Sequence, residues 1–201
     1  ALARATHENL LAVYVMDLDG FKPVNDQHGH DVGDELLVAV ARRLQGHLRQ
    51  SDVIARLGGD EFVVMTGELQ STTQAHELGL KLLEAFSSPF ALGGIQVQVG
   101  LTIGYAIAPI DSQDGAGLIK LADAAMYSGK QSGKFCVRRN TGDLALASAE
   151  DRQALLVPGD CIPGQSPSVP LHMRLRQLST EPVPLPIAKV PPAMPKLRVS
   201  R

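Results

Sequence analysis

The distribution of proline sets the strongest limit on what this chain can fold into. Of its 13 prolines, three precede residue 140 and ten lie between Pro158 and Pro195. Proline lacks the backbone N–H and fixes φ, so a stretch such as TEPVPLPIAKVPPAMPK cannot sustain a helix or a central strand. We therefore expect one folded domain over residues 1–140, followed by an extended, disordered, proline-rich tail over residues 141–201.

Composition narrows the classes of function. The chain has 201 residues, of which 44% are hydrophobic and 20% charged, so it can bury a real core. Its formal net charge of −2 lacks the basic excess typical of nucleic-acid or membrane-surface binders. No run of about 18 apolar residues is present, so we expect no membrane contact by this segment. Cys136 and Cys161 are too few for a disulfide framework and indicate free thiols in a reducing cytoplasm.

Apolar patterning predicts how the folded part is organised. Residues 19–26, DGFKPVND, read as a loop, and Gly58-Gly59 has the turn chemistry of a two-residue β-hairpin. Strands are predicted from apolar runs and from period-two alternation, at residues 10–19, 52–57, 61–66, 95–107 and 135–139. Helices are predicted from apolar residues three and four apart, at residues 31–48, 72–88 and 117–130. Hairpins mixed with crossover helices indicate an α+β fold, with a mixed, largely antiparallel central sheet flanked by helices.

Four acidic residues suggest chemistry. Asp17 and Asp19 end the first predicted strand, and Asp60 and Glu61 lie in the predicted hairpin. If these strands are neighbours, the carboxylates converge and repel one another unless a cation joins them or their pKa values rise. Hard oxygen ligands suit Mg²⁺, which shares its shell with substrate phosphates. The alternative is a plain hairpin whose acids face water, and the residues alone leave both interpretations open.

Three motifs resemble one family in order and spacing. DLDGFKPVNDQHGHDVGDELL, RLGGDEF and ADAAMYSGKQSGK are similar to the motifs of GGDEF-domain diguanylate cyclases, over about residues 1–140. The resemblance implies a nucleotidyl-cyclase or palm-like fold and the condensation of two GTP molecules into cyclic di-GMP with release of two pyrophosphates. It also implies a homodimer, because each protomer brings one GTP.

The resemblance assigns roles to individual residues. Asp17 and the backbone carbonyl of Leu18 would bind Mg²⁺, or Mn²⁺, together with Asp60. Glu61 would hold a second ion or assist deprotonation of the attacking ribose hydroxyl, so Asp60 and Glu61 are the catalytic candidates. The substrate-binding candidates are Gly59, which leaves room for the nucleotide, Asn25 and Asp34 for guanine, and Gly20, Phe21, Lys22, Lys130 and Lys134 for phosphates.

Two further features follow from the resemblance. Arg49 and Asp52, in RQSD, match an R-x-x-D inhibitory site that binds cyclic di-GMP as a product inhibitor. Lys134 stands where the family usually has Arg, which keeps the charge but loses the bidentate fork. The family's opening D-x-L-T-G-L-x-N-R segment is missing, so we expect an N-terminally truncated domain, cut from a parent that can carry a membrane anchor elsewhere.

Other interpretations stay open at this point. Arg49 and Asp52 can form an ordinary surface ion pair, and Lys130 and Lys134 can be favourable charges at a helix end. His28 and His30 are expected to be loop and capping residues, because Mg²⁺ prefers oxygen. The whole chain can also be a catalytically impaired module that binds GTP or cyclic di-GMP and regulates a partner domain. A related adenylate or guanylate cyclase is the more remote alternative.

Overall fold

The computed structural model describes residues 2–140, and the predicted tail over residues 141–201 lies outside them. A single 3₁₀ turn at Leu2–Arg4 comes first. The strands are β1 (Leu10–Asp19), β2 (Val53–Gly58), β3 (Glu61–Leu69), β4 (Phe90–Leu92), β5 (Ile95–Val97), β6 (Gly100–Ala108) and β7 (Val137–Arg139). The helices are α1 (Phe21–His28), α2 (His30–Gln45), α3 (Thr72–Glu84) and α4 (Gly115–Gln131).

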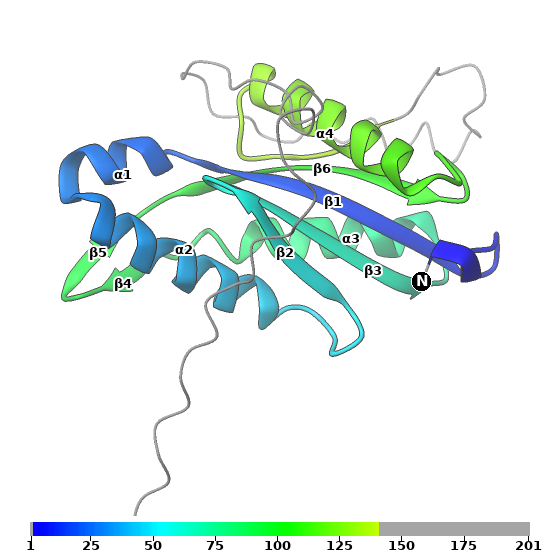
Figure 1. Ribbon diagram of the computed structural model, residues 1–201, viewed down its shortest axis with the longest axis horizontal. Coiled ribbons are helices and arrows are strands. Elements are labelled where there is room, and N and C mark those ends of the chain that lie inside the picture. The colour runs from blue at the N-terminus through cyan, green and yellow to red at the C-terminus, as the bar shows by residue number, and fades with distance from the viewer. Residues whose placement is uncertain (1, 141–201) are drawn as a thin grey trace, which may run out of the picture.

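A five-stranded sheet in the order β2-β3-β1-β6-β7 forms the centre of the fold (Figure 1). β1 is antiparallel to both β3 and β6, and β2 is antiparallel to β3, whereas β7 runs parallel to β6. The short strands β4 and β5 form a separate hairpin at one end of the molecule. The predicted mixed, largely antiparallel sheet is therefore confirmed.

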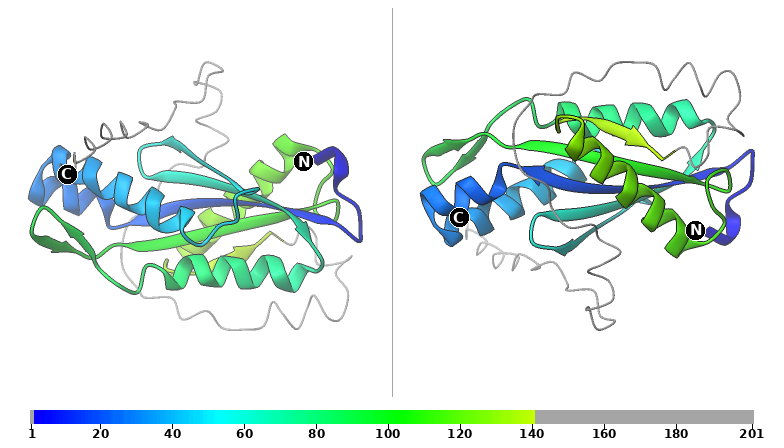
Figure 2. Two further views of the ribbon diagram at one scale, coloured as in Figure 1. Left: turned by 90° about the horizontal axis from the view of Figure 1, so that it is seen from below. Right: turned by 90° about the horizontal axis from the view of Figure 1, so that it is seen from above.

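Helices cover the two faces of this sheet unequally. α2 and α3 lie on one face and α4 crosses the other, as the two opposite views in Figure 2 show. The larger hydrophobic cluster contains Tyr14, Met16 and Leu18 of β1, and the smaller one, under α4, contains Val13 and Val15. Side chains alternate along a strand, so Asp17 and Asp19 share the α4 face with Val13 and Val15.

Residues 21–26 of the expected loop belong instead to helix α1, Phe21–His28. Pro23 is compatible with this helix because it lies in the first helical turn, where an amide hydrogen has no intrahelical acceptor and is not missed. Gly20, with φ of 89°, precedes the helix and turns the chain out of β1. Helix α1 thus begins directly beside the end of the strand that carries the acids.

The long strand predicted over residues 95–107 is interrupted. β5 ends at Val97 and β6 begins at Gly100. Between them the side-chain amide of Gln98 donates to the carbonyl oxygen of Phe86 at 2.8 Å, so this segment bonds to the end of α3 rather than to a neighbouring strand. Val99 in the interruption is still buried, so the alternation of apolar residues continues through it. The sequence pattern therefore did not indicate where β5 ends.

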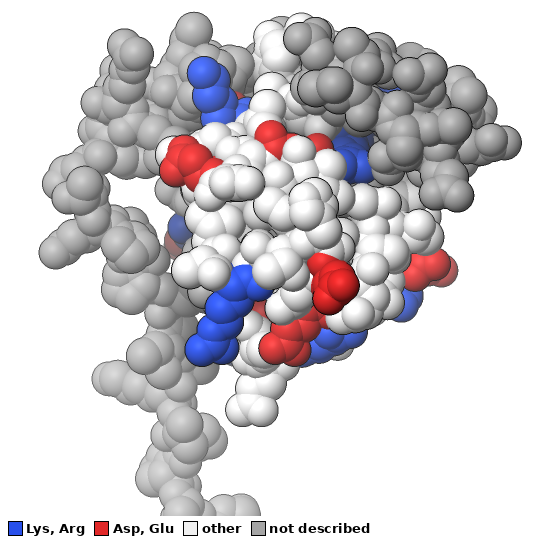
Figure 3. Space-filling view, turned by 90° about the vertical axis from the view of Figure 1, so that its right-hand side faces the viewer, with Lys and Arg blue, Asp and Glu red and all other residues white. Residues whose placement is uncertain are grey.

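Within residues 2–140, none of the helices combines the length and the hydropathy needed to cross a bilayer. At the end of the molecule near the N-terminus, the described residues visible in Figure 3 carry charges of both signs scattered among neutral side chains. The acids of interest lie at the opposite end, where β1 meets α1.

Candidate active site

The register between β1 and β3 brings two carboxylates together. Asp17 is paired with Glu61 across the antiparallel ladder, so their side chains leave the same face of the sheet. Only 4% of Asp17 and 2% of Glu61 is exposed. Two acids from distant parts of the sequence are therefore buried side by side on the α4 face.

The hairpin that holds Asp60 differs by one residue from the prediction. Gly58 belongs to β2 and is paired with Glu61, so the two turn residues are Gly59 and Asp60 rather than the two glycines. A register shift between Arg56 and Gly58 takes up the extra residue. Gly59 has φ of 55°, a left-handed conformation that glycine adopts without steric cost.

A backbone hydrogen bond joins this turn to the acid-bearing strand. The amide of Leu18 donates to the carbonyl oxygen of Asp60 at 3.2 Å. The bond fixes Asp60 close to Asp17, and the negative charge of Asp60 is one of the causes that raise the pKa of Asp17. The predicted convergence of Asp17, Asp60 and Glu61 on one end of the sheet is thus present. The carbonyl of Leu18 as a metal ligand stays a prediction.

Lys130 of α4 supplies the positive charge in this cluster. Its ammonium nitrogen lies 2.6 Å from Oδ1 of Asp17 and 2.5 Å from Oδ1 of Asp19. Burial alone would lower the pKa of Lys130, but the charges of Asp17 and Asp19 outweigh it and raise that pKa. With 8% of the residue exposed, Lys130 is a buried cation between two carboxylates, and it also lies in the last turn of α4, so the helix-end alternative stays open beside the predicted phosphate contact.

Burial dominates the protonation of Asp17. Its pKa is raised from 3.8 to about 6 by the sum of several effects: burial, the largest, raises it, Lys130 lowers it, and the charges of Asp60 and Asp19 raise it. The ammonium of Lys130 therefore compensates only part of the cost of keeping this carboxylate charged. A site with this balance favours an additional cation.

Two glycines let α4 come close enough for Lys130 to reach the acids. A Cβ at Gly104 of β6 would lie 2.1 Å from the carbonyl oxygen of Ala122 and 2.1 Å from the amide nitrogen of Met126. A Cβ at Gly129 would lie 2.9 Å from the side chains of both Thr102 and Cys136. Any larger residue at these positions would push the helix away from the sheet. Neither glycine was among the predicted site residues.

The predicted phosphate-binding segment lies at the N-terminus of α1. No side chain caps this helix, so its first amides are available to an anion, and the helix dipole favours negative charge there. Phe21 is the first helical residue and Lys22 is exposed beside it. Phosphate binding by Gly20, Phe21 and Lys22 stays a prediction, and a helix end rather than the expected loop would present the amides.

Asn25 and Asp34 lie on successive helices. The Oδ1 atom of Asn25 is buried and has no hydrogen-bond partner among the described residues. A Cβ at Gly33 would lie 1.8 Å from that atom, so Gly33 makes room for the Asn25 side chain. Asp34 is exposed, and it lines an open groove of about 550 Å³ between α2 and the β4–β5 hairpin. Gly33 is a further residue that the motif reading did not single out.

Lys134 follows the end of α4 at a strained position. Its φ is 65°, which is uncommon for a residue with a side chain. Its amide donates to the carbonyl oxygen of Gly129 at 3.0 Å and so closes the helix end. The structure places Lys134 in the loop between α4 and β7, four residues beyond the buried Lys130.

Arg49 and Asp52 lie in a tight turn far from the acids along the sheet. The carboxylate of Asp52 accepts the backbone N–H of Arg49 at 2.8 Å and the hydroxyl of Thr66 at 2.7 Å. The guanidinium of Arg49 is exposed. The Asp52 carboxylate thus bonds to the backbone of Arg49 and to Thr66, and the ion-pair alternative stays open. Binding of an inhibitor here remains a prediction.

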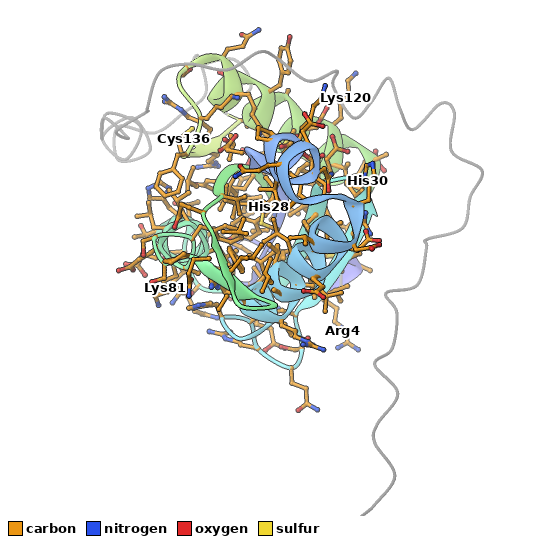
Figure 4. All side chains as sticks on the ribbon, turned by 90° about the vertical axis from the view of Figure 1, so that its left-hand side faces the viewer. Arg4, His28, His30, Lys81, Lys120 and Cys136 are labelled. Atoms are coloured by element: carbon orange, nitrogen blue, oxygen red, sulfur yellow. The ribbon has the colours of Figure 1, made fainter. Side chains whose placement is uncertain are left out.

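His28 and His30 flank the junction of α1 and α2, at the end of the molecule seen in Figure 4. Both are exposed. Among residues 2–140, no group of three or more His, Cys, Asp or Glu side chains is arranged to hold a metal unaided. Binding of Mg²⁺ or Mn²⁺ stays a prediction, in which substrate and water would have to supply part of the oxygen ligands.

Sequence comparison connects this geometry with known proteins. A family model described as "Diguanylate cyclase, GGDEF domain" matches residues 1–136. The chain belongs to the GGDEF family. Its GGDEF domain is 46% identical over 147 residues to the bifunctional diguanylate cyclase/cyclic di-GMP phosphodiesterase MucR of Pseudomonas aeruginosa, covering 72% of this chain and 21% of MucR.

A second relative gives both a sequence and a structural match. Diguanylate cyclase TpbB of Pseudomonas aeruginosa is 41% identical over 150 residues, covering 74% of this chain and 33% of TpbB. The crystal structure of the GGDEF domain of TpbB matches with a TM-score of 0.66 at 39% identity, covering 68% of this chain and 86% of that one. The chain thus spans a third or less of both full-length relatives, while its GGDEF domain and palm-like fold are confirmed.

Proposed function

We propose that this GGDEF domain is a diguanylate cyclase that condenses two molecules of GTP into cyclic di-GMP and releases two pyrophosphates. The observation that carries the proposal is the buried pairing of Asp17 with Glu61 on the α4 face, with the Lys130 ammonium bound to Asp17. The relatives named diguanylate cyclase support the same reaction at the level of the family.

A divalent cation fits the residues at this site. Asp17, Asp60 and Glu61 offer only oxygen donors, the kind that Mg²⁺ and Mn²⁺ prefer. The raised pKa of Asp17, caused mainly by burial, indicates that Lys130 leaves part of the negative charge uncompensated. When bound, the ion would neutralise charge on the α-phosphate as the bond to the leaving pyrophosphate breaks.

The chain's own residues would orient GTP. Unpaired amides at the start of α1 and the exposed Lys22 suit the β- and γ-phosphates. The buried, unsatisfied Oδ1 of Asn25 suits a hydrogen-bond donor on guanine, and Asp34 suits the N1–H and N2–H₂ groups of the base. Glu61 either assists removal of the proton from the attacking 3′-hydroxyl or helps to hold a second ion.

Two protomers are needed for one reaction. Each 3′-hydroxyl must attack the α-phosphorus of the other GTP, so two half-sites have to face each other across a two-fold axis. We propose a homodimer for this reason. We also propose that cyclic di-GMP inhibits the enzyme at the turn that carries Arg49 and Asp52, whose exposed guanidinium can reach a phosphate.

The activity is tested by incubating the full chain with GTP and Mg²⁺ and measuring cyclic di-GMP by liquid chromatography and mass spectrometry. Glu61→Gln and Asp60→Ala are expected to reduce product formation at least about a hundredfold, as loss of a group at a reacting centre does. Glu68→Gln is the matched control, because Glu68 lies on the same strand but is exposed at its far end, and it should keep wild-type turnover.

The binding-module alternative gives a different result. It is favoured by Lys134, which replaces the forked guanidinium of the family with a single ammonium. A wild-type chain that binds a GTP analogue in calorimetry but forms no cyclic di-GMP at any Mg²⁺ or Mn²⁺ concentration would establish the module and exclude the cyclase. Competition by ATP equal to that of GTP would exclude guanine selectivity.

A further inference from the structure

Asp19 binds three donors that come from three different parts of the fold. Its Oδ1 accepts the ammonium of Lys130 at 2.5 Å. Its Oδ2 accepts the hydroxyl of Thr102 at 2.7 Å and the backbone N–H of Phe135 at 3.1 Å. Only 11% of the side chain is exposed. One carboxylate therefore joins α4, β6 and the loop between α4 and β7.

The loop that Asp19 holds has an unusual backbone. Gly133, Lys134 and Phe135 have φ of 127°, 65° and 46°. Left-handed conformations are costly for residues that carry a Cβ, and they persist only where the surroundings fix them. Asp19 and Thr102, whose Oγ1 also accepts the Phe135 N–H at 3.1 Å, provide that fixation directly after Lys134.

Asp19 is less suited than Asp17 to bind a metal ion. Both carboxylates contact Lys130, but Oδ2 of Asp19 is committed to Thr102 and Phe135, which disfavours a role as a metal ligand. If Asp17 takes another partner, Asp19 still keeps the Lys130 ammonium at this edge of the sheet. The same side chain sets the backbone next to Lys134.

We propose that Asp19 is a positioning residue that places both cationic side chains, Lys130 and Lys134, for the phosphates of the bound nucleotide. It acts on Lys130 through an ion pair and on Lys134 through the hydrogen bond to the amide of Phe135. The proposal rests on the proposed function, because the triphosphate it serves is that of GTP.

The experiment compares Asp19→Asn, Thr102→Val and Thr102→Ser in the full chain. Binding of a GTP analogue with a non-cleavable α,β-methylene bridge is measured by calorimetry in the presence of Mg²⁺, and binding of guanosine by NMR titration. Asp19→Asn should weaken analogue binding about tenfold or more, as expected for loss of charge-assisted hydrogen bonds. Guanosine binding should be unchanged, because guanosine carries no phosphate for the lysines to contact.

Hydrogen exchange reports on the loop independently of the nucleotide. The amide of Phe135 should exchange about tenfold faster in Asp19→Asn and Thr102→Val than in the wild type, because each variant removes one of its two acceptors or weakens it. Thr102→Ser keeps the hydroxyl and should restore both wild-type exchange and wild-type analogue binding.

Asp114→Ala is the control for a general loss of helix stability. Asp114 caps the N-terminus of α4 by accepting the amide of Gly117 at 2.9 Å, so its loss destabilises α4 without touching Asp19. This variant should leave analogue binding and Phe135 exchange unchanged. Equal weakening of analogue and guanosine binding in Asp19→Asn, or the same losses in Asp114→Ala, would overturn the positioning role.

The two proposals fail in different ways. A wild-type chain that binds the analogue but forms no cyclic di-GMP overturns the cyclase, whereas the analogue and exchange comparisons still decide the role of Asp19. A productive wild type with an Asp19→Asn variant that binds the analogue equally well overturns the positioning role alone.

Discussion

Asp17 is the residue at which stability and the proposed function oppose each other. It is buried beside Glu61, and its pKa rises from 3.8 to about 6 mainly because of that burial. Between these two pH values the folded state holds more protons than the unfolded state, so stability falls as pH rises through the window. Above about pH 6 the full cost of the charged group is present, on the order of 3 kcal/mol at about 1.4 kcal/mol for each pKa unit.

We therefore expect Asp17→Asn to stabilise the metal-free protein at pH 7.5 by about 1–3 kcal/mol while abolishing cyclic di-GMP formation. Urea unfolding in EDTA measures the first effect and product analysis the second. Adding Mg²⁺ should raise the stability of the wild type and not of the variant, since a ligand stabilises only the state that binds it. An Asp17→Asn variant less stable than the wild type in EDTA would contradict this view of the site.

Single residues also mark where sequence reasoning reached its limit. The four acids could be named from their chemistry and spacing, whereas Lys130 and Asn25 were named only through the resemblance to the GGDEF motifs. Gly104 and Gly33 could not be named, because their function is to have no side chain at a contact that exists only after folding. A glycine inside a predicted strand or helix is costly, and that cost was the available signal. Thr102 gave no comparable signal.

At the scale of elements, the local patterns predicted β1 at its observed bounds and failed where tertiary contacts intervene. α1 was missed because residues 19–26 were read as a loop, although Pro23 is tolerated in a first helical turn. Helices predicted to reach residues 48 and 88 end at Gln45 and Glu84, since apolar residues beyond a helix can pack on the core without being helical. The inner strands were predictable because burial on both faces leaves long apolar runs.

The contact between α3 and β6 contains an ionisable group outside the candidate site. Nδ1 of His76 lies 3.2 Å from the hydroxyl of Tyr105, with the two rings tilted against each other. Burial lowers the pKa of His76 below 6.5, and Glu77 only partly opposes this. The folded state therefore resists protonation of a side chain that the unfolded state protonates freely.

The lowered pKa of His76 makes the folded state less stable at acidic pH. Below pH 6.5 the unfolded state binds more protons at this position, so the contribution of His76 to stability is lost as pH falls. We expect His76→Gln to lose less stability than the wild type between pH 7.5 and pH 5.5, measured as the change in unfolding free energy in urea. The exposed His47, replaced in the same way, is the matched control for the substitution. Equal losses in His76→Gln and the wild type would contradict the expectation.

For the whole molecule, the proposed activity depends on the association of two copies of the chain. One described protomer provides one set of acids and one helix N-terminus, and the proposed reaction needs two. We expect the rate of cyclic di-GMP formation per protomer to rise with protein concentration until the dimer is saturated. Product formation at increasing chain concentration, beside the molar mass from light scattering, tests this. A rate per protomer that is constant from a monomeric to a dimeric sample would contradict it.

The position of β1 has a consequence for how a nucleotide gains access. β1 is bonded along its length to β3 on one side and to β6 on the other, so separating it from either neighbour would disrupt both flanking clusters of the core. We therefore expect β1, which carries Asp17 and Asp19, to be among the last segments of the domain to unfold locally. In the proposed reaction, entry and exit of the nucleotide would therefore depend on α1, the Gly59–Asp60 turn and the loop after α4, while the carboxylates stay in place.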